Sequence, residues 1–282
     1  MKGGTFSMRF FHSLLRPEEN AGRAMRCVHR LWVFLWLTAF GLGIGLLSLY
    51  LTANSYASID AQALWESYFK LPLLVVMDLL LPLLVVYLGF FLFARPWAAY
   101  LLSAVPFLGL ALASYYKIQL RGDPVLASDL RLIRTAGGIM GNYTFELTEP
   151  VKLVIAGFVG MLIFSVVLLR RERMSQRGRL VGLMAMLTLT LASYFELYTS
   201  ADIYEKTANN SLINPWSEVE IYLSRGTTYP FLYSVQDMFP NAPSGYRESE
   251  ATGTLAEYED TDIPEEEKIT VVGIMLEAFS DL

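Results

Sequence analysis

The sequence predicts a multi-pass α-helical membrane protein, in which a five-helix transmembrane bundle is followed by a linker and by the first strand of an incomplete extracytoplasmic α/β domain. Hydrophobic residues make up 54% of the 282 residues and charged residues 17%, whereas an average soluble domain has roughly 25% charged residues. Five stretches approach or exceed the roughly 20 apolar residues that a helix needs to cross a bilayer. A further apolar run near residue 270 is shorter and rich in β-branched residues, which is typical of a buried strand.

These stretches divide the chain into four parts. Residues 1–30 form a basic arm, and residues 31–199 form the transmembrane domain. The predicted spans are 31–51, 71–93, 97–116, 151–169 and 180–197. Residues 200–268 are expected to form juxtamembrane helices and an acidic linker, and residues 269–282 the start of a truncated domain. The second and third spans contain Pro72, Pro82 and Pro106, and membrane helices tolerate proline better than soluble helices do.

The distribution of Lys and Arg predicts the orientation, because these residues are retained on the cytoplasmic side. The arm is basic, and residues 170–179 contain five arginines, whereas loop 52–70 contains only Lys70. The chain is therefore expected to lie in the cell membrane with a cytoplasmic N-terminus and an extracytoplasmic C-terminus. Loop 117–150 departs from this pattern, since it carries four basic residues on the predicted outer side. The first span exceeds the 7–15 apolar residues of a signal peptide, although a small-residue site near Ala57 leaves cleavage open.

Composition also excludes some kinds of functional site. The single cysteine, Cys27, excludes an internal disulfide and a cysteine-based metal cluster. Both histidines, His12 and His29, precede the first span. The largest basic cluster flanks membrane spans, where topology explains it, so the charge pattern favours no nucleic-acid partner.

Two segments outside the predicted spans have amphipathic character. Ser128 or Asp129 is expected to cap a short helix that begins near Leu130 and lies at the membrane interface. This helix either only braces the bundle or presents Arg131 and Arg134 to anionic lipid headgroups.

After the fifth span, residues 217–224 and 228–239 are predicted to form two amphipathic helices, broken at Arg225-Gly226. Residues 239–268 are strongly acidic and predict a solvated linker. We find no internal repeat.

Asp78 is the one ionisable residue deep in a long predicted span. Intramembrane acids are costly, and they usually face the bundle interior or a water-filled cavity. One interpretation is a transport or proton-relay role. The other is a buried partner for a Tyr, Ser or basic residue of another span. Since no basic residue lies deep in another span, a protonated or hydroxyl-bonded carboxyl group is expected.

The apolar run 269–276 predicts a strand buried on both faces, and Glu277 follows it directly. Open α/β folds place their ligands at the carboxyl ends of such strands. One carboxylate cannot complete a metal site, which needs several ligands in a defined geometry. The residues alone therefore indicate the membrane-anchored N-terminal part of a larger extracytoplasmic α/β protein.

Three segments resemble the lipoteichoic acid synthase-like proteins, which are membrane phosphoglycerol transferases of the alkaline phosphatase and sulfatase superfamily. Val271-Val-Gly-Ile-Met-Leu-Glu-Ala-Phe-Ser-Asp-Leu282 resembles the opening of their catalytic domain. Asp123-Pro-Val-Leu-Ala-Ser-Asp-Leu130 looks like their loop between the third and fourth spans. Tyr229-Pro-Phe-Leu-Tyr-Ser234, followed by Pro243-Ser-Gly-Tyr246, looks like their juxtamembrane connector. With five spans and an outside C-terminus, the resemblance covers most of the chain.

The resemblance implies a role for Glu277 as a ligand of the catalytic divalent metal, usually manganese. The family's threonine nucleophile and its remaining Asp and His ligands match no position in residues 1–282, so this chain alone is expected to be inactive. Ala278 stands where the family often has Ser, which affects a supporting hydrogen bond rather than the ligand.

The implied reaction is a double displacement. Threonine attacks the phosphorus of phosphatidylglycerol, diacylglycerol leaves, and the glycerophosphoryl group passes to a growing polymer or glycolipid. Membrane lipids are therefore the expected partners. Sulfate esters and phosphoethanolamine remain alternative substrates.

A different class of function also stays open: a non-catalytic five-span transporter, scaffold or regulator that uses Asp78.

Overall fold

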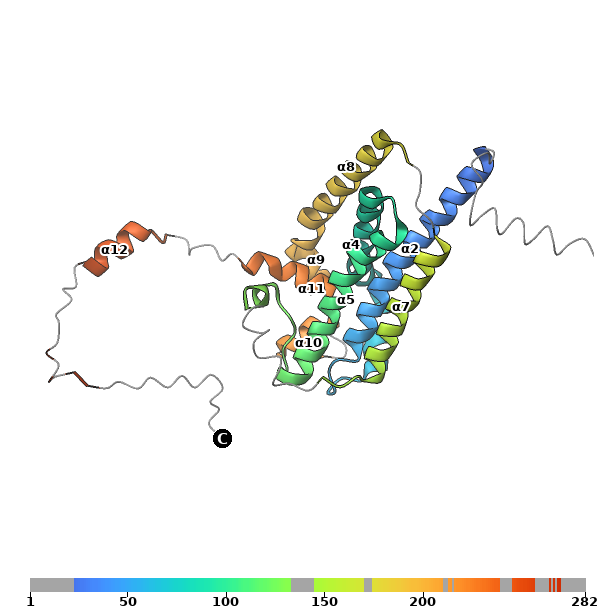
Figure 1. Cartoon of the computed structure of the whole chain (residues 1–282). Helices are drawn as coiled ribbons and strands as arrows, with labels where there is room; N and C mark the ends of the chain where they lie inside the picture. Colours follow the sequence, from blue (N-terminus) through green and yellow to red (C-terminus); the bar gives the residue numbers. More distant parts are fainter. Residues whose placement is uncertain are drawn as a thin grey trace, which may run out of the picture. The chain divides into compact units, whose positions relative to one another are not determined.

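The computed structural model describes residues 23–132, 145–169, 174–209, 213–214, 216–238, 245–256, 264, 266 and 268–269 (Figure 1). The chain divides into two compact units, Met1–Phe239 and Pro240–Leu282, and each is described by itself. Within the described ranges the regular structure is helical.

Five helices of the first unit are long and apolar enough to cross a membrane, which confirms the predicted multi-pass architecture. They are α2 (Arg23–Ala53), α4 (Pro72–Phe93), α5 (Pro96–Arg121), α7 (Glu149–Leu168) and α8 (Gln176–Ser193). The π-helix η3 (Tyr194–Tyr198) continues α8. The boundaries differ most for α2, which begins at Arg23 rather than near residue 31. Long Arg side chains reach the interface while the helix continues, so charge alone does not end a membrane helix.

The chain reverses between α4 and α5 for local reasons. Ala94 ends α4 in the left-handed conformation, with φ of 53°, and its N–H bonds to the carbonyl of Phe90. Arg95 is extended, as expected before a proline, and Pro96 begins α5. The two helices therefore lie side by side and antiparallel (Figure 1).

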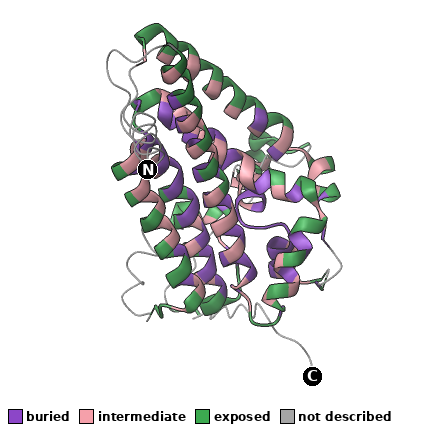
Figure 2. Cartoon of the chain, turned by 90° about the vertical axis from the view of Figure 1, so that its right-hand side faces the viewer, coloured by how far each residue is buried: buried purple, intermediate pink, exposed green. Residues whose placement is uncertain are grey.

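Helices α2, α4 and α5 pack on one another, α7 packs against α2 and α5, and α8 packs against α4. The helix backbones approach closely at Gly41 of α2, where an added Cβ would lie 2.6 Å from the Cα of Leu83 in α4. Small residues allow such approaches between membrane helices. Figure 2 shows buried residues where helices face one another and exposed residues on their outer faces. The outer faces of α7 and α8 are largely apolar, as expected for lipid contact.

Shorter helices occupy the segments between and after the spans. They are α3 (Ala61–Lys70), η1 (Ala127–Leu132), α9 (Ala201–Lys206), α10 (Glu218–Ser224), α11 (Thr228–Tyr233) and η4 (Ser234–Met238). The break at Arg225-Gly226 between α10 and α11 confirms the two predicted pieces. We call residues 217–238, which contain α10, α11 and η4, the connector. Helix α3 lies in segment 52–70, for which the sequence predicts a loop, and Asp60 caps it by accepting a hydrogen bond from the N–H of Gln62.

The prediction that a helix begins near Leu130 was wrong. The 3-10 helix η1 begins at Ala127 instead. Asp129 lies inside it, where its carboxylate accepts the N–H of Leu126 and pairs with Lys117, each at 2.8 Å. Asp129, the residue that was expected to cap a helix, therefore links η1 to α5 through Lys117.

In the second unit, α12 (Glu248–Ala256) lies within the predicted acidic linker. It has no buried residue, and an exposed ion pair joins Arg247 to Glu250. Residues 270–282, with most of the predicted strand and Glu277, lie outside the described residues.

Candidate functional site

Asp78 lies in α4 and is fully buried. Its Oδ1 accepts hydrogen bonds from the backbone N–H groups of Thr228, at 2.8 Å, and Tyr229, at 3.3 Å. These residues begin α11, so Asp78 satisfies N–H groups that have no partner within their own helix. The sequence predicts a Tyr, Ser or basic partner on another span, or a protonated carboxyl group. The partner is instead the backbone of the connector, which enters the bundle.

Gly226 forms the link between α10 and α11 and packs on the same carboxyl group. Its φ is +87°, a conformation that costs other residues free energy. An added Cβ would lie 2.1 Å from Asp78 Oδ2, which is much closer than van der Waals contact. Glycine is therefore required here both by the backbone conformation and by the close approach of the carboxyl group.

Buried hydroxyl groups around Asp78 also hold backbone atoms. Tyr68 of α3 donates to the carbonyl of Leu223 at 2.7 Å. The hydroxyls of Thr52, near the end of α2, and Thr227 share a hydrogen bond. Burial raises the pKa of Tyr68 well above its usual value, which keeps its phenol protonated and able to donate.

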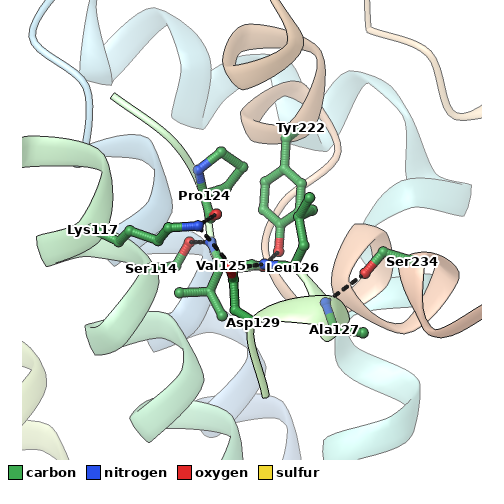
Figure 3. A network of polar contacts seen from close by, with 9 residues as sticks. All are labelled: Ser114, Lys117, Pro124, Val125, Leu126, Ala127, Asp129, Tyr222 and Ser234. Atoms are coloured by element: carbon green, nitrogen blue, oxygen red, sulfur yellow. Dashed lines mark hydrogen bonds and ion pairs between the residues drawn. The ribbon is translucent and has the colours of Figure 1, made fainter. Parts of the chain in front are cut away.

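The connector also contacts loop 123–130, which follows α5 (Figure 3). The hydroxyl of Ser234 accepts the N–H of Ala127 at 3.0 Å. The hydroxyl of Tyr222 lies 3.0 Å from the carbonyl of Val125 and 3.1 Å from that of Thr227, and it donates toward both. Two segments that are about 100 residues apart in sequence are thereby joined, and the contact between Ala127 and Ser234 is buried.

The same loop is fixed to α5 from its other side (Figure 3). Lys117 Nζ donates to the carbonyl of Pro124 and to the carboxylate of Asp129, both at 2.8 Å. Ser114 Oγ accepts the N–H of Val125 at 3.3 Å. Loop 123–130 is therefore a structured bridge between α5 and the connector.

Arg225 and two tyrosines attach the connector to α9. The guanidinium of Arg225 lies 4.3 Å from the centre of the Tyr204 ring, whose other stacking partner is Tyr233 at 3.9 Å. Arg225 Nε also donates to the carbonyl of Tyr204 at 3.2 Å. Although it is charged, Arg225 is buried, with an exposed fraction of only 6%. The stack and the carbonyls replace part of the hydration that burial removes.

The remaining predicted site residues fall in different places. Arg131 donates to the carbonyl of Met238, so it links η1 to η4. Its predicted contact with lipid headgroups stays a prediction. Arg134 and Glu277 lie outside the described residues. Among the residues that the structure describes, no three His, Cys, Asp or Glu side chains form a group that could hold a metal ion.

Sequence reasoning singled out Asp78 but missed the residues that meet it. Gly226, Thr228 and Tyr222 stand in a polar and aromatic stretch that resembles an ordinary amphipathic helix. The one available signal was Arg225-Gly226, a charged residue and a helix breaker inside an otherwise weakly charged segment. In comparisons with known proteins, no family model, curated protein or solved structure matches this chain.

Proposed function

We propose that this chain is the membrane anchor and connector of a metal-dependent phosphoglycerol transferase of the lipoteichoic acid synthase-like kind, or of a related sulfatase-superfamily hydrolase, that works at the outer leaflet. One observation gives this proposal its strongest support. Loop 123–130 and the connector segment 229–234, on which much of the resemblance rests, are hydrogen-bonded to each other through Ala127 and Ser234. Two motifs recognised separately in the sequence therefore belong to one structural unit.

The Asp78 contact supports an anchoring role. A buried carboxyl group, a glycine fitted against it and the hydroxyls of Tyr68 and Tyr222 hold the connector to the rest of this unit. Such a connector positions whatever follows it relative to the membrane. For an enzyme that acts on lipid, this raises the effective concentration of substrate at the site.

The arrangement of charges supports the proposed orientation. Arg179 of α8 donates to the carbonyls of Phe91 and Leu92, which places the basic first turn of α8 beside the end of α4. Arg30 of α2 shares a pocket with Met174 at this same end. The connector meets the opposite ends of α2 and α5. We infer that the basic end is cytoplasmic and that the connector is extracytoplasmic.

The proposed metal site depends on Glu277, which lies outside the described residues, and on ligands that match no position in residues 1–282, so we derive no step through it. When bound, a divalent metal would stabilise charge on the phosphoryl oxygens and activate the nucleophile. The proposed contribution of the described residues is to hold the connector beside the leaflet that contains phosphatidylglycerol.

The alternative is a transporter, scaffold or regulator without catalysis. A transport role predicts that Asp78 faces a water-filled cavity. Asp78 is instead fully buried. Its contacts with the backbone of the connector favour a structural role for this carboxyl group.

The test uses the protein encoded by the complete reading frame, reconstituted in phosphatidylglycerol vesicles with Mn²⁺. Release of diacylglycerol is expected, and Glu277→Gln is expected to abolish it because a neutral amide is a weaker metal ligand. Glu266→Gln, an exposed position in the acidic linker, is the matched control and should retain activity. A reading frame that supplies no further Thr, Asp and His set, or full activity of Glu277→Gln, would contradict the proposal.

A further inference from the structure

An open groove of about 800 Å³ lies on the outer surface of the bundle, where α4 ends and α5 begins. Its walls are apolar and include Phe93 of α4 and Leu101 and Val105 of α5. Arg95 and Trp97 stand at the end nearest the α4–α5 turn. The groove is separate from the Asp78 site and does not depend on the proposed function.

The length of the groove fits one leaflet. On α5 its lining begins at Trp97 and ends at Pro106. Nine residues of helix rise roughly 14 Å at about 1.5 Å per residue. This is about half of the roughly 30 Å hydrocarbon core. The groove therefore extends from the level of the headgroups to near the middle of the bilayer, which is the depth of one acyl chain.

The end of the groove has the charge that an anionic headgroup requires. Arg95 is exposed, and within the described part of the chain its side chain has no hydrogen bond or ion pair. Arg179 does not line the groove, and its guanidinium donates to the carbonyls of Phe91 and Leu92. Tryptophan is favoured at the same membrane level. One exposed cation and an interfacial indole thus stand at the end of an apolar channel.

We propose that this groove binds an anionic phospholipid, with its phosphate at Arg95 and one acyl chain along α5 beneath Trp97. The contact with phosphate is charge-assisted, and the acyl chain covers apolar side chains that are partly exposed, such as Val105 at 59%. A second copy of the chain could also cover this face, but it would leave Arg95 without an anion unless it supplied one.

The test is native mass spectrometry of the purified chain incubated with equal amounts of phosphatidylglycerol and phosphatidylcholine that carry identical acyl chains. The wild type is expected to retain phosphatidylglycerol preferentially. Arg95→Gln should reduce that preference about fivefold, the effect of one basic residue at an anionic surface. Ala98→Phe, which fills the groove, should reduce retention of both lipids. Arg177→Gln is the matched control, since Arg177 is exposed on α8 and does not line the groove.

Three outcomes would overturn the proposal. Equal retention of the two lipids by the wild type would indicate ordinary boundary lipid. An equal loss of preference in Arg95→Gln and Arg177→Gln would indicate diffuse attraction to the basic end. A disulfide between copies of Val105→Cys, in a Cys27→Ser background in vesicles, would show that a second copy covers the groove. Thermal unfolding of each variant identifies misfolded protein, and Arg95→Gln changes only an exposed residue, so its result stands even if Ala98→Phe does not fold.

Discussion

Asp78 Oδ1 accepts the backbone N–H of Thr228 at 2.8 Å, although the two residues are 150 positions apart. The contact fastens the segment that follows the fifth membrane helix to the interior of the second. Removing the carboxyl group would leave the N–H groups of Thr228 and Tyr229 buried without an acceptor.

Asp78→Ala is therefore expected to lower the free energy of unfolding by about 3 kcal/mol, since each buried unsatisfied donor costs about 1–3 kcal/mol. Asp78→Asn keeps one acceptor oxygen and should cost less. Thermal unfolding in detergent micelles measures both. Asp202→Ala removes only an exposed ion pair with Lys206 and serves as the control. Equal stability of Asp78→Ala and wild type would show that the contact contributes nothing.

Gly226→Ala is expected to destabilise the protein by about 3 kcal/mol, because left-handed backbone strain and overpacking act together. Gly122→Ala separates the two causes. Its φ is also positive, at +76°, but no atom lies within 4 Å of the added Cβ, so only the strain of about 1 kcal/mol remains. In an Asp78→Ala background the cost of Gly226→Ala should shrink, as expected for coupled neighbours. Strict additivity in this double-mutant cycle would argue against the close approach.

Ser234→Ala removes the acceptor for the buried N–H of Ala127. We expect a loss of about 1 kcal/mol of stability and faster hydrogen exchange at the amide of residue 127. Ser128→Ala changes an exposed hydroxyl on the same loop and should leave exchange unchanged. If both variants exchanged alike, the loop and the connector would be independent.

Stability is expected to fall at alkaline pH. Burial raises the pKa of Tyr222 well above its usual value and that of Tyr229 to about 12. An unfolded tyrosine ionises near pH 10. The contribution of each is thus fully present below about pH 10 and is lost as the pH rises further, at up to about 1.4 kcal/mol per pH unit per group.

Tyr222→Phe should make this decline shallower, whereas Tyr246→Phe, at an exposed position, should not. The measurement is thermal unfolding of the three proteins between pH 8 and pH 12. A decline of the same slope in all three would contradict the assignment to Tyr222.

The proposed orientation is tested by labelling in intact cells. In a Cys27→Ser background, a cysteine at Ser249 of α12 should react with a membrane-impermeant thiol reagent. A cysteine at Gln176, at the start of α8, should react only after the membrane is permeabilised. The opposite pattern would invert the topology.

The five spans could be predicted from the sequence because a membrane helix forms its backbone hydrogen bonds internally and is recognised by apolar length. The ends of the helices were harder to predict than the spans themselves. Arg30 lies within α2, since charge near an interface does not stop a helix. The start of η1 was misplaced because Asp129, a good capping residue, is held by Lys117 of another helix.

The candidate site could also be predicted only in part. That Asp78 would be buried and would need partners followed from its residue type and its place in an apolar run. Its partners are backbone N–H groups of the connector, which carry no signal in side-chain composition.

The sequence by itself determined that the chain has five membrane helices, a basic end and a break at Arg225-Gly226, because these depend on local composition and conformation. Only the tertiary structure decided that the break packs against Asp78 and that Ser234 meets Ala127. Contacts between residues more than 100 positions apart depend on how the helices pack, and packing is set by the fit of all their side chains together rather than by any one segment.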